Sequence, residues 1–198
     1  MDFKDGHWHV STKQGVFTSP VVINAAGGWA SKVAKMANAA PINIQPLRRS
    51  CAIIPVPDGQ EITHWPAFGT VTEQWYGKPE AGKLMVSPAE ETPVEPHDVW
   101  AEDMILAEGI DRYSQMVTAP VTRVEHTWAG MRSFAPDRSL VIGFDKQATG
   151  FFWLAGQGGY GIQTAAAASE LVADLCLNRA PKLSAEVVAN LSPARFSI

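Results

Sequence analysis

The stretch GFFWLAGQGGYGIQTAAAASELVADL, residues 150–175, decides the fold that this chain can adopt. The apolar run 151–155 has the composition of a buried strand, and the glycine-rich run 156–161 indicates a tight turn. Residues 162–177 then have the composition of a helix. Such a unit brings bare backbone next to the free N–H groups of a helix N-terminus. The stretch therefore predicts a corner that can bind an anion or the polar edge of a ring.

The glycines of this turn also match a dinucleotide-binding fingerprint, because Gly156, Gly158 and Gly161 satisfy G-x-G-x-x-G between a strand and a helix. A complete nicotinamide site would need a further parallel strand after the helix and an acidic residue about 20 residues on. The remaining tail, 179–198, has no strand pattern. The residues alone thus favour a ligand-binding corner over a complete dinucleotide site. They leave open a turn that only packs its alanine-rich helix closely on a sheet.

A second unit of the same kind stands near the start of the chain, in TSPVVINAAGGWAS (18–31). The apolar run 21–23 predicts a buried strand, and the small residues 25–28 predict a tight turn. Residues 29–40 have helical composition, and Pro41 is expected to stop that helix. From the pattern alone, this turn either brings backbone close to a ligand or only lets the helix pack closely on the strand.

The middle of the chain is predicted to be mostly antiparallel sheet. Residues 42–87 hold short strand-like runs separated by proline, glycine and aspartate turns. An acidic loop (89–98), an amphipathic helix (100–116) and a strand (121–128) are expected to follow. The predicted fold class is therefore α+β, with an antiparallel middle flanked by two strand–glycine–helix units.

Composition excludes several classes of function. A content of 46% hydrophobic and 18% charged residues excludes disordered and fibrous proteins, and a net charge of -4 gives no basic surface for nucleic acid. No apolar run reaches the roughly 18 residues of a membrane span, and the first residues lack a signal peptide. Only two cysteines, Cys51 and Cys176, are present, which is typical of a reducing compartment. We therefore expect a cytoplasmic protein.

A third motif, TWAGMRSFAPDRSLVIG (127–143), carries the most promising charged side chain. Arg132 offers a planar, bidentate fork for a carboxylate, which lysine cannot match. The alternative is a structural ion pair of Arg132 with Asp137 or with another acidic residue. His7 and His9 face one side of a predicted strand, but no third ligand is nearby, so no metal site is expected.

In their order and spacing, the three motifs resemble the C-terminal half of the FAD-dependent D-amino-acid oxidase superfamily. The glycine oxidase, sarcosine oxidase and D-amino-acid dehydrogenase branches are the most similar, and LSPARF (191–196) resembles the usual ending of the family. The resemblance implies a remnant of the FAD-binding domain at 1–45 and 126–198, and an antiparallel substrate-binding domain at 46–125. It also implies that the N-terminal Rossmann βαβ unit, which binds the FAD pyrophosphate in the family, is absent from this chain.

The resemblance also implies roles for individual residues. Arg132 would hold the carboxylate of the substrate, and Gln157 stands where many relatives carry histidine. Tyr76, Arg48 and Arg49 are pocket candidates only by position. The helix dipole after the second turn would suit the negative charge of reduced flavin. The residues implied to contact FAD are Ala26, Gly27, Gly28 and Trp29 in the first turn, and Gly156, Gln157, Gly158, Gly159, Tyr160, Gly161 and Ile162 in the second.

The implied reaction is oxidation of the C–N bond of a small amino acid or amine, of the glycine or D-amino-acid type, by hydride transfer to the flavin. We expect the isolated chain to bind FAD weakly or not at all and to be inactive. Two alternatives stay open: a non-enzymatic binding or interaction module, and one subunit of a split flavoenzyme whose partner supplies the Rossmann half. An exposed apolar surface would favour docking of that half or self-association.

Overall fold

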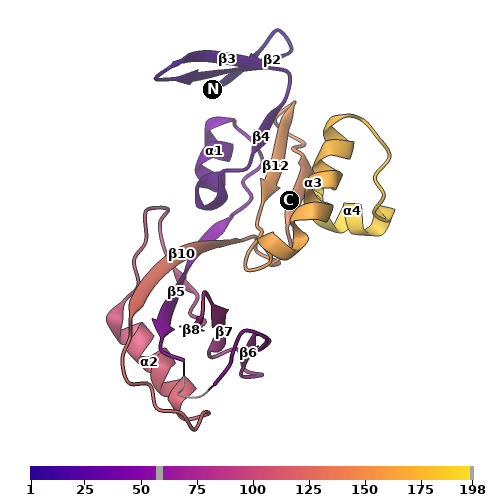
Figure 1. The fold of residues 1–198 in the computed structure, drawn as a ribbon. Helices are drawn as coiled ribbons and strands as arrows, with labels where there is room; N and C mark the ends of the chain where they lie inside the picture. Colours follow the sequence, from indigo (N-terminus) through magenta and orange to yellow (C-terminus); the bar gives the residue numbers. More distant parts are fainter. Residues whose placement is uncertain (57–59, 197–198) are drawn as a thin grey trace. The chain divides into compact units, whose positions relative to one another are not determined.

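The computed structural model describes residues 1–56 and 60–196, which form two compact units. The first unit comprises Met1–Pro46 and Arg132–Ile198, and the second comprises Leu47–Met131 (Figure 1). The domains expected from the sequence, 1–45 with 126–198 and 46–125, stay a prediction. The assignment of FAD-binding and substrate-binding roles to the two units stays a prediction.

The first unit opens with a three-stranded antiparallel sheet. Its strands are β1 (Asp2–Lys4), β2 (His7–Thr12) and β3 (Gly15–Ser19), in that order. Trp8 is the buried residue of β2, and its ring meets the edge of Phe151 at a centroid distance of 6.1 Å. This contact ties the small sheet to the core of the first unit.

A second sheet forms the centre of the first unit, with the order β11 (Val141–Phe144), β12 (Phe151–Ala155) and β4 (Val22–Asn24). The central strand β12 pairs antiparallel with β11 and parallel with β4. Its apolar run is continuous because both of its faces are covered. Phe151 and Trp153 pack in the core cluster that contains the buried residues of α1, and Phe152 packs with Leu171 of α3.

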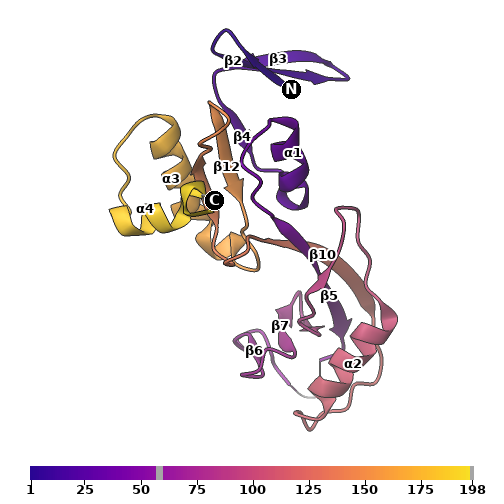
Figure 2. The same cartoon turned by 180° about the vertical axis from the view of Figure 1, so that it is seen from behind.

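The helices of the first unit lie on both sides of this sheet (Figure 2). The short 3₁₀ helix η1 (Gly27–Trp29) leads into α1 (Ala30–Met36), while α3 (Gly161–Cys176) and α4 (Ala185–Leu191) lie on the opposite side, followed by η2 (Pro193–Phe196). The helix predicted after the glycine-rich turn is thus confirmed. The expectation that the first helix reaches Pro41 is wrong, because Asn38 takes a left-handed φ of 51° and ends it early.

The second unit is a mostly antiparallel sheet covered on one face by α2 (Asp103–Ser114). The strand order is β10-β5-β8-β7-β6, with β9 also on β5, and the pairs β5–β8, β7–β8, β6–β7 and β5–β9 are antiparallel. The sheet therefore confirms the antiparallel middle of the α+β class. Its strands are β5 (Gln45–Ile54), β6 (Phe68–Gly69), β7 (Tyr76–Glu80), β8 (Lys83–Ser87), β9 (Thr92–Pro93) and β10 (His126–Phe134).

The expectation of a strand over 121–128 is wrong, because β10 begins at His126 and continues to Phe134. A glycine inside a strand pattern often weakens or interrupts the strand. In the structure Gly130 is an exposed strand residue with open space around its backbone, so it does not interrupt β10. Arg132 therefore lies within a strand rather than in a loop.

Candidate functional site

The parallel pairing of β4 and β12 brings the two predicted glycine turns to one edge of the central sheet. Phe151 lies opposite Val22 and Trp153 opposite Asn24. Each strand then runs into a turn and a helix. Because the carboxyl ends of parallel strands lie at the same edge of a sheet, both turns lie at that edge. Local patterns predicted each turn, but they did not predict that the strands before the two turns pair with each other.

The first turn is held by Asn24, which ends β4 and is only 1% exposed. Its Nδ2 donates to the carbonyl of Ala30 (2.9 Å), and its Oδ1 accepts from the N–H of Ala26 (3.4 Å). The side chain therefore spans the turn and fixes its shape. Sequence reasoning missed this residue, although a polar residue at the end of a buried strand is a recognisable signal.

Two residues of the first turn are open to a ligand. Gly27 has a left-handed φ of 55°, and a Cβ there would meet no atom within 4 Å. Trp29 keeps 44% of its surface exposed, which is unusual for a tryptophan beside a packed helix. The turn thus presents bare backbone and an aromatic side chain on its outer side.

In the second turn, Gly156 and Gly158 are required by the fold itself. Both have a left-handed φ, of 76° and 53°. A Cβ on Gly158 would stand 2.4 Å from the ring of Phe134, and one on Gly156 would stand 3.3 Å from the carbonyl of Ser139. The N–H of Gly158 also donates to the carbonyl of Ser133 at 2.9 Å. The end of β10 and the loop after it therefore form the wall behind this turn.

Gly159 differs from both of these glycines. Its φ is outside the left-handed range, and a Cβ would meet no described atom within 4 Å. Neither conformation nor internal space therefore requires glycine at this position. A glycine that the fold does not need fits a site where a ligand approaches the backbone closely.

The N-terminus of α3 follows directly and is uncapped by any side chain of the described residues. The first N–H groups of a helix have no partner within it, and Thr164 is the first residue of α3 whose N–H bonds back, to the carbonyl of Tyr160 (3.0 Å). The first turn of α3 carries no acidic residue. The free N–H groups and the positive end of the helix dipole therefore fit an acceptor oxygen or an anion.

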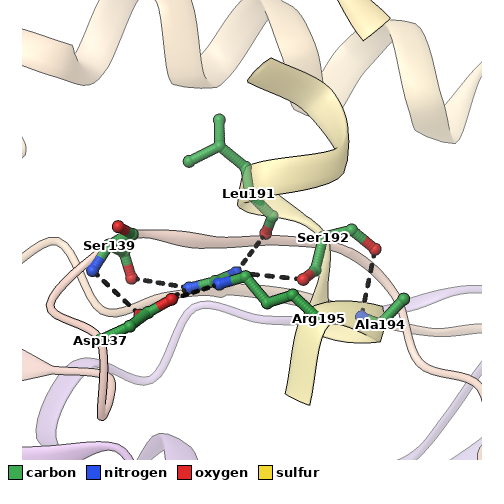
Figure 3. Close-up of polar contacts among 6 residues, drawn as sticks. All are labelled: Asp137, Ser139, Leu191, Ser192, Ala194 and Arg195. Carbon is green, nitrogen blue, oxygen red and sulfur yellow. Dashed lines mark hydrogen bonds and ion pairs between the residues drawn. The ribbon is translucent and has the colours of Figure 1, made fainter. Parts of the chain in front are cut away.

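Arg132 is exposed on β10, immediately before Ser133, whose carbonyl holds Gly158. Within the part of the chain that the structure describes, the side chain of Arg132 forms no hydrogen bond or ion pair. The alternative of an ion pair with Asp137 is wrong, because Asp137 is bound by Arg195 at 2.7 Å (Figure 3). Hydrogen bonds from Arg195 lower the pKa of Asp137. The guanidinium of Arg132 is thus free to bind an external carboxylate.

The remaining residues of the second turn face outward. Ile162 is 97% exposed and Tyr160 is 45% exposed, whereas Gln157 is partly buried and its carbonyl accepts from the N–H of Tyr160 (3.0 Å). Two such exposed apolar side chains beside a turn leave room for contact with a further molecule.

The three pocket candidates of the second unit do not share one environment. Arg48 is buried and makes ion pairs with Glu102 and, at 3.9 Å, with Glu90. The neighbouring Arg49 bonds the Glu90 carbonyl and Glu91, and alternation along β5 sends it to the opposite face from Arg48. Tyr76 is partly buried on β7. The guanidinium of Arg48 is therefore already paired with carboxylates of the second unit.

The described residues contain neither a cluster of metal-ligating side chains nor a membrane-spanning helix. No group of three or more His, Cys, Asp and Glu side chains is placed to hold a metal ion among them. No helix in the described ranges is both long enough and apolar enough to cross a membrane.

Comparison with known proteins agrees with this geometry. The family model described as FAD dependent oxidoreductase (DAO) matches residues 1–175. The chain belongs to this family, the D-amino-acid oxidase superfamily.

Solved structures share the fold at low sequence identity. Glycine oxidase from Geobacillus kaustophilus has a TM-score of 0.81 and 19% identity, covering 100% of this chain and 51% of that chain. L-proline dehydrogenase from P. horikoshii has a TM-score of 0.80 and 22% identity, with coverage of 98% and 52%. Iminodiacetate oxidase from Chelativorans sp. BNC1 has a TM-score of 0.79 and 17% identity, with coverage of 97% and 51%. The chain therefore spans about half the length of each of these structures.

Proposed function

We propose that this chain is the C-terminal half of a flavoenzyme that oxidises the C–N bond of a small amino acid or amine of the glycine or D-amino-acid type. The observation that carries the proposal is the glycine edge, which we define as Ala26–Trp29 and Gly156–Ile162. It combines bare backbone, an uncapped helix N-terminus and a glycine that the fold does not require. Membership of the FAD-dependent family supports flavin as the ligand.

The residues present fit the ring of FAD. The free N–H groups at the start of α3 would donate to the polar edge of the ring, and Gly159 would let the ring approach the backbone. The turn at Gly27 would contact FAD from β4, the neighbouring strand. FAD, when bound, would supply the acceptor for a hydride from the substrate.

Arg132 would bind the carboxylate of the substrate. Glycine, proline and iminodiacetate, which the names of the similar structures mention, all carry a carboxylate on the carbon next to the amine nitrogen. A bidentate guanidinium would fix that carboxylate and so orient the Cα–H bond. Arg132 would thus act through orientation rather than through proton transfer.

We further propose that the chain needs a second polypeptide segment to bind FAD tightly. The support is the free edge of β4, which pairs only with β12 among the described residues and carries Ile23, 44% exposed. An open strand edge beside exposed apolar side chains is a surface onto which another segment can add a strand. Such a segment, on the same or another chain, would supply the pyrophosphate site.

The test compares two flavins on the purified chain. Riboflavin has the ring but no pyrophosphate, so a site that holds only the ring should bind FAD and riboflavin within about threefold of each other. Flavin fluorescence quenching gives both affinities. Tight, stoichiometric FAD retention through purification would contradict the half-site, and failure to bind either flavin would favour a non-enzymatic module that kept only the fold.

A further inference from the structure

Arg195, near the end of the chain, has all five of its guanidinium N–H donors engaged (Figure 3). Nε and Nη2 donate to the two carboxylate oxygens of Asp137, at 2.7 and 3.1 Å. Nη2 also donates to the carbonyl of Ser139 (3.0 Å), and Nη1 donates to the carbonyls of Leu191 and Ser192. The side chain of Arg195 is only 14% exposed, whereas that of Asp137 is 41% exposed.

The acceptors come from two separate segments of the first unit. Leu191 and Ser192 belong to the end of α4 and the residue after it, while Asp137 and Ser139 belong to the loop between β10 and β11. Asp137 also accepts from the N–H of Ser139 (3.1 Å), which closes the loop on itself. Arg195 therefore fixes the shape of this loop from outside.

The same loop is the wall behind the second glycine turn. The carbonyl of Ser139, which Arg195 binds, stands 3.3 Å from the position of a Cβ on Gly156. At the start of the loop, the ring of Phe134 closes on Gly158 and is itself covered by the guanidinium of Arg138, 4.1 Å from the ring centroid. A shift of the loop would therefore move the surface against which both glycines pack.

We infer that Arg195 is a positioning residue for the glycine edge: it locks the loop between β10 and β11 and thereby sets the position of the turn Gly156–Gly161. The inference rests on the proposed function, because the turn matters to chemistry only if it receives the flavin ring. Lysine cannot replace Arg195, since one ammonium cannot bind both carboxylate oxygens in plane and reach three carbonyls.

The first test needs no flavin. In the Arg195→Lys variant, amide hydrogen exchange is followed at Gly158, which donates to Ser133, and at Asp145, which donates to the carbonyl of Phe151 across β11 and β12. Positioning predicts that exchange at Gly158 accelerates about tenfold more than exchange at Asp145. Equal acceleration at both amides would overturn the inference, because it would mean that Arg195 only stabilises the first unit as a whole.

Two further variants sharpen the comparison. Asp137→Asn keeps the size of the side chain and removes its charge, so it should accelerate exchange at Gly158 in the same direction but less. Arg179→Lys is the matched control, because the side chain of Arg179 is exposed and forms no bond within the described residues. A response of Gly158 to Arg179→Lys equal to that of Arg195→Lys would also overturn the inference.

Riboflavin titration then separates this inference from the proposed function. If both hold, Arg195→Lys binds riboflavin several-fold more weakly than the unchanged chain and Arg179→Lys does not. If exchange at Gly158 accelerates selectively in Arg195→Lys but neither this variant nor the unchanged chain binds riboflavin, the positioning role of Arg195 stands and the flavin function is refuted. If riboflavin binds equally well to the unchanged chain and to Arg195→Lys, and exchange at Gly158 does not respond selectively, the positioning role of Arg195 is refuted while the flavin function stands.

Discussion

Two adjacent glycines offer a sharp comparison, because the same change to alanine should act in opposite directions. Gly158→Ala places a Cβ 2.4 Å from the ring of Phe134 at a φ of 53°. Overpacking costs about 1–3 kcal/mol and a left-handed alanine about 1 kcal/mol more, so the variant should lose about 2–4 kcal/mol of unfolding free energy. Gly159→Ala meets no atom within 4 Å and no strained φ. It should gain up to about 1 kcal/mol, because alanine restricts the unfolded chain.

Denaturant unfolding of the two variants measures both free energies. The second readout is riboflavin binding, which Gly159→Ala should weaken about tenfold or more, since one added methyl group in a close contact has that effect. Gly158→Ala serves as the control for general damage. The reasoning is refuted if Gly159→Ala destabilises the chain as much as Gly158→Ala does. It is also refuted if the Gly159→Ala variant is more stable than the unchanged chain but binds riboflavin with the same affinity.

Three further outcomes follow from specific contacts within the first unit. Asn24→Ala should cost about 1–3 kcal/mol in denaturant unfolding, since the carbonyl of Ala30 loses its buried partner; an unchanged midpoint would contradict the role given to Asn24. Asp137 has a lowered pKa in the folded chain, caused first by hydrogen bonds from Arg195, so its carboxylate stabilises the fold above the ordinary pKa of 3.8 and loses this effect as pH falls through the lower folded value. Asp137→Asn should therefore be less stable than the unchanged chain at neutral pH, and the difference should vanish in acid; a pH-independent difference would argue against the ion pair. Leu171→Ala should cost about 2–5 kcal/mol by opening a cavity between α3 and the sheet, measured by thermal or denaturant unfolding, and a loss below about 1 kcal/mol would contradict that packing.

Local patterns predicted the elements that carry the glycine edge. The apolar run of β12 and the alanine-rich residues of α3 are strong short-range signals. The observed bounds of both elements differ from the predicted bounds by at most one residue. The first helix was predicted too long, because the composition of 29–40 does not reveal that Asn38 adopts a left-handed φ. One asparagine that can adopt the left-handed conformation is a weak signal among residues of helical composition on both sides.

Long-range features could not be predicted from local patterns. The parallel pairing of β4 with β12 joins segments more than a hundred residues apart, and no periodicity encodes such a partner. The sequence left open an ion pair between Asp137 and the nearby Arg132, whereas the structure pairs Asp137 with Arg195. Proximity in sequence could not reveal Arg195 as the partner, since residues 191–195 fold back onto the loop after β10.

The central claim is that the glycine edge receives a flavin ring, and one titration tests it most directly. Riboflavin is added to the 15N-labelled chain, and the amide resonances are followed by NMR. The account predicts shifts concentrated at residues 26–29 and 156–162, with Gly159 among the largest, and smaller shifts for the same residues in Gly159→Ala. Binding without shifts at either turn, or shifts confined to residues elsewhere, would contradict it.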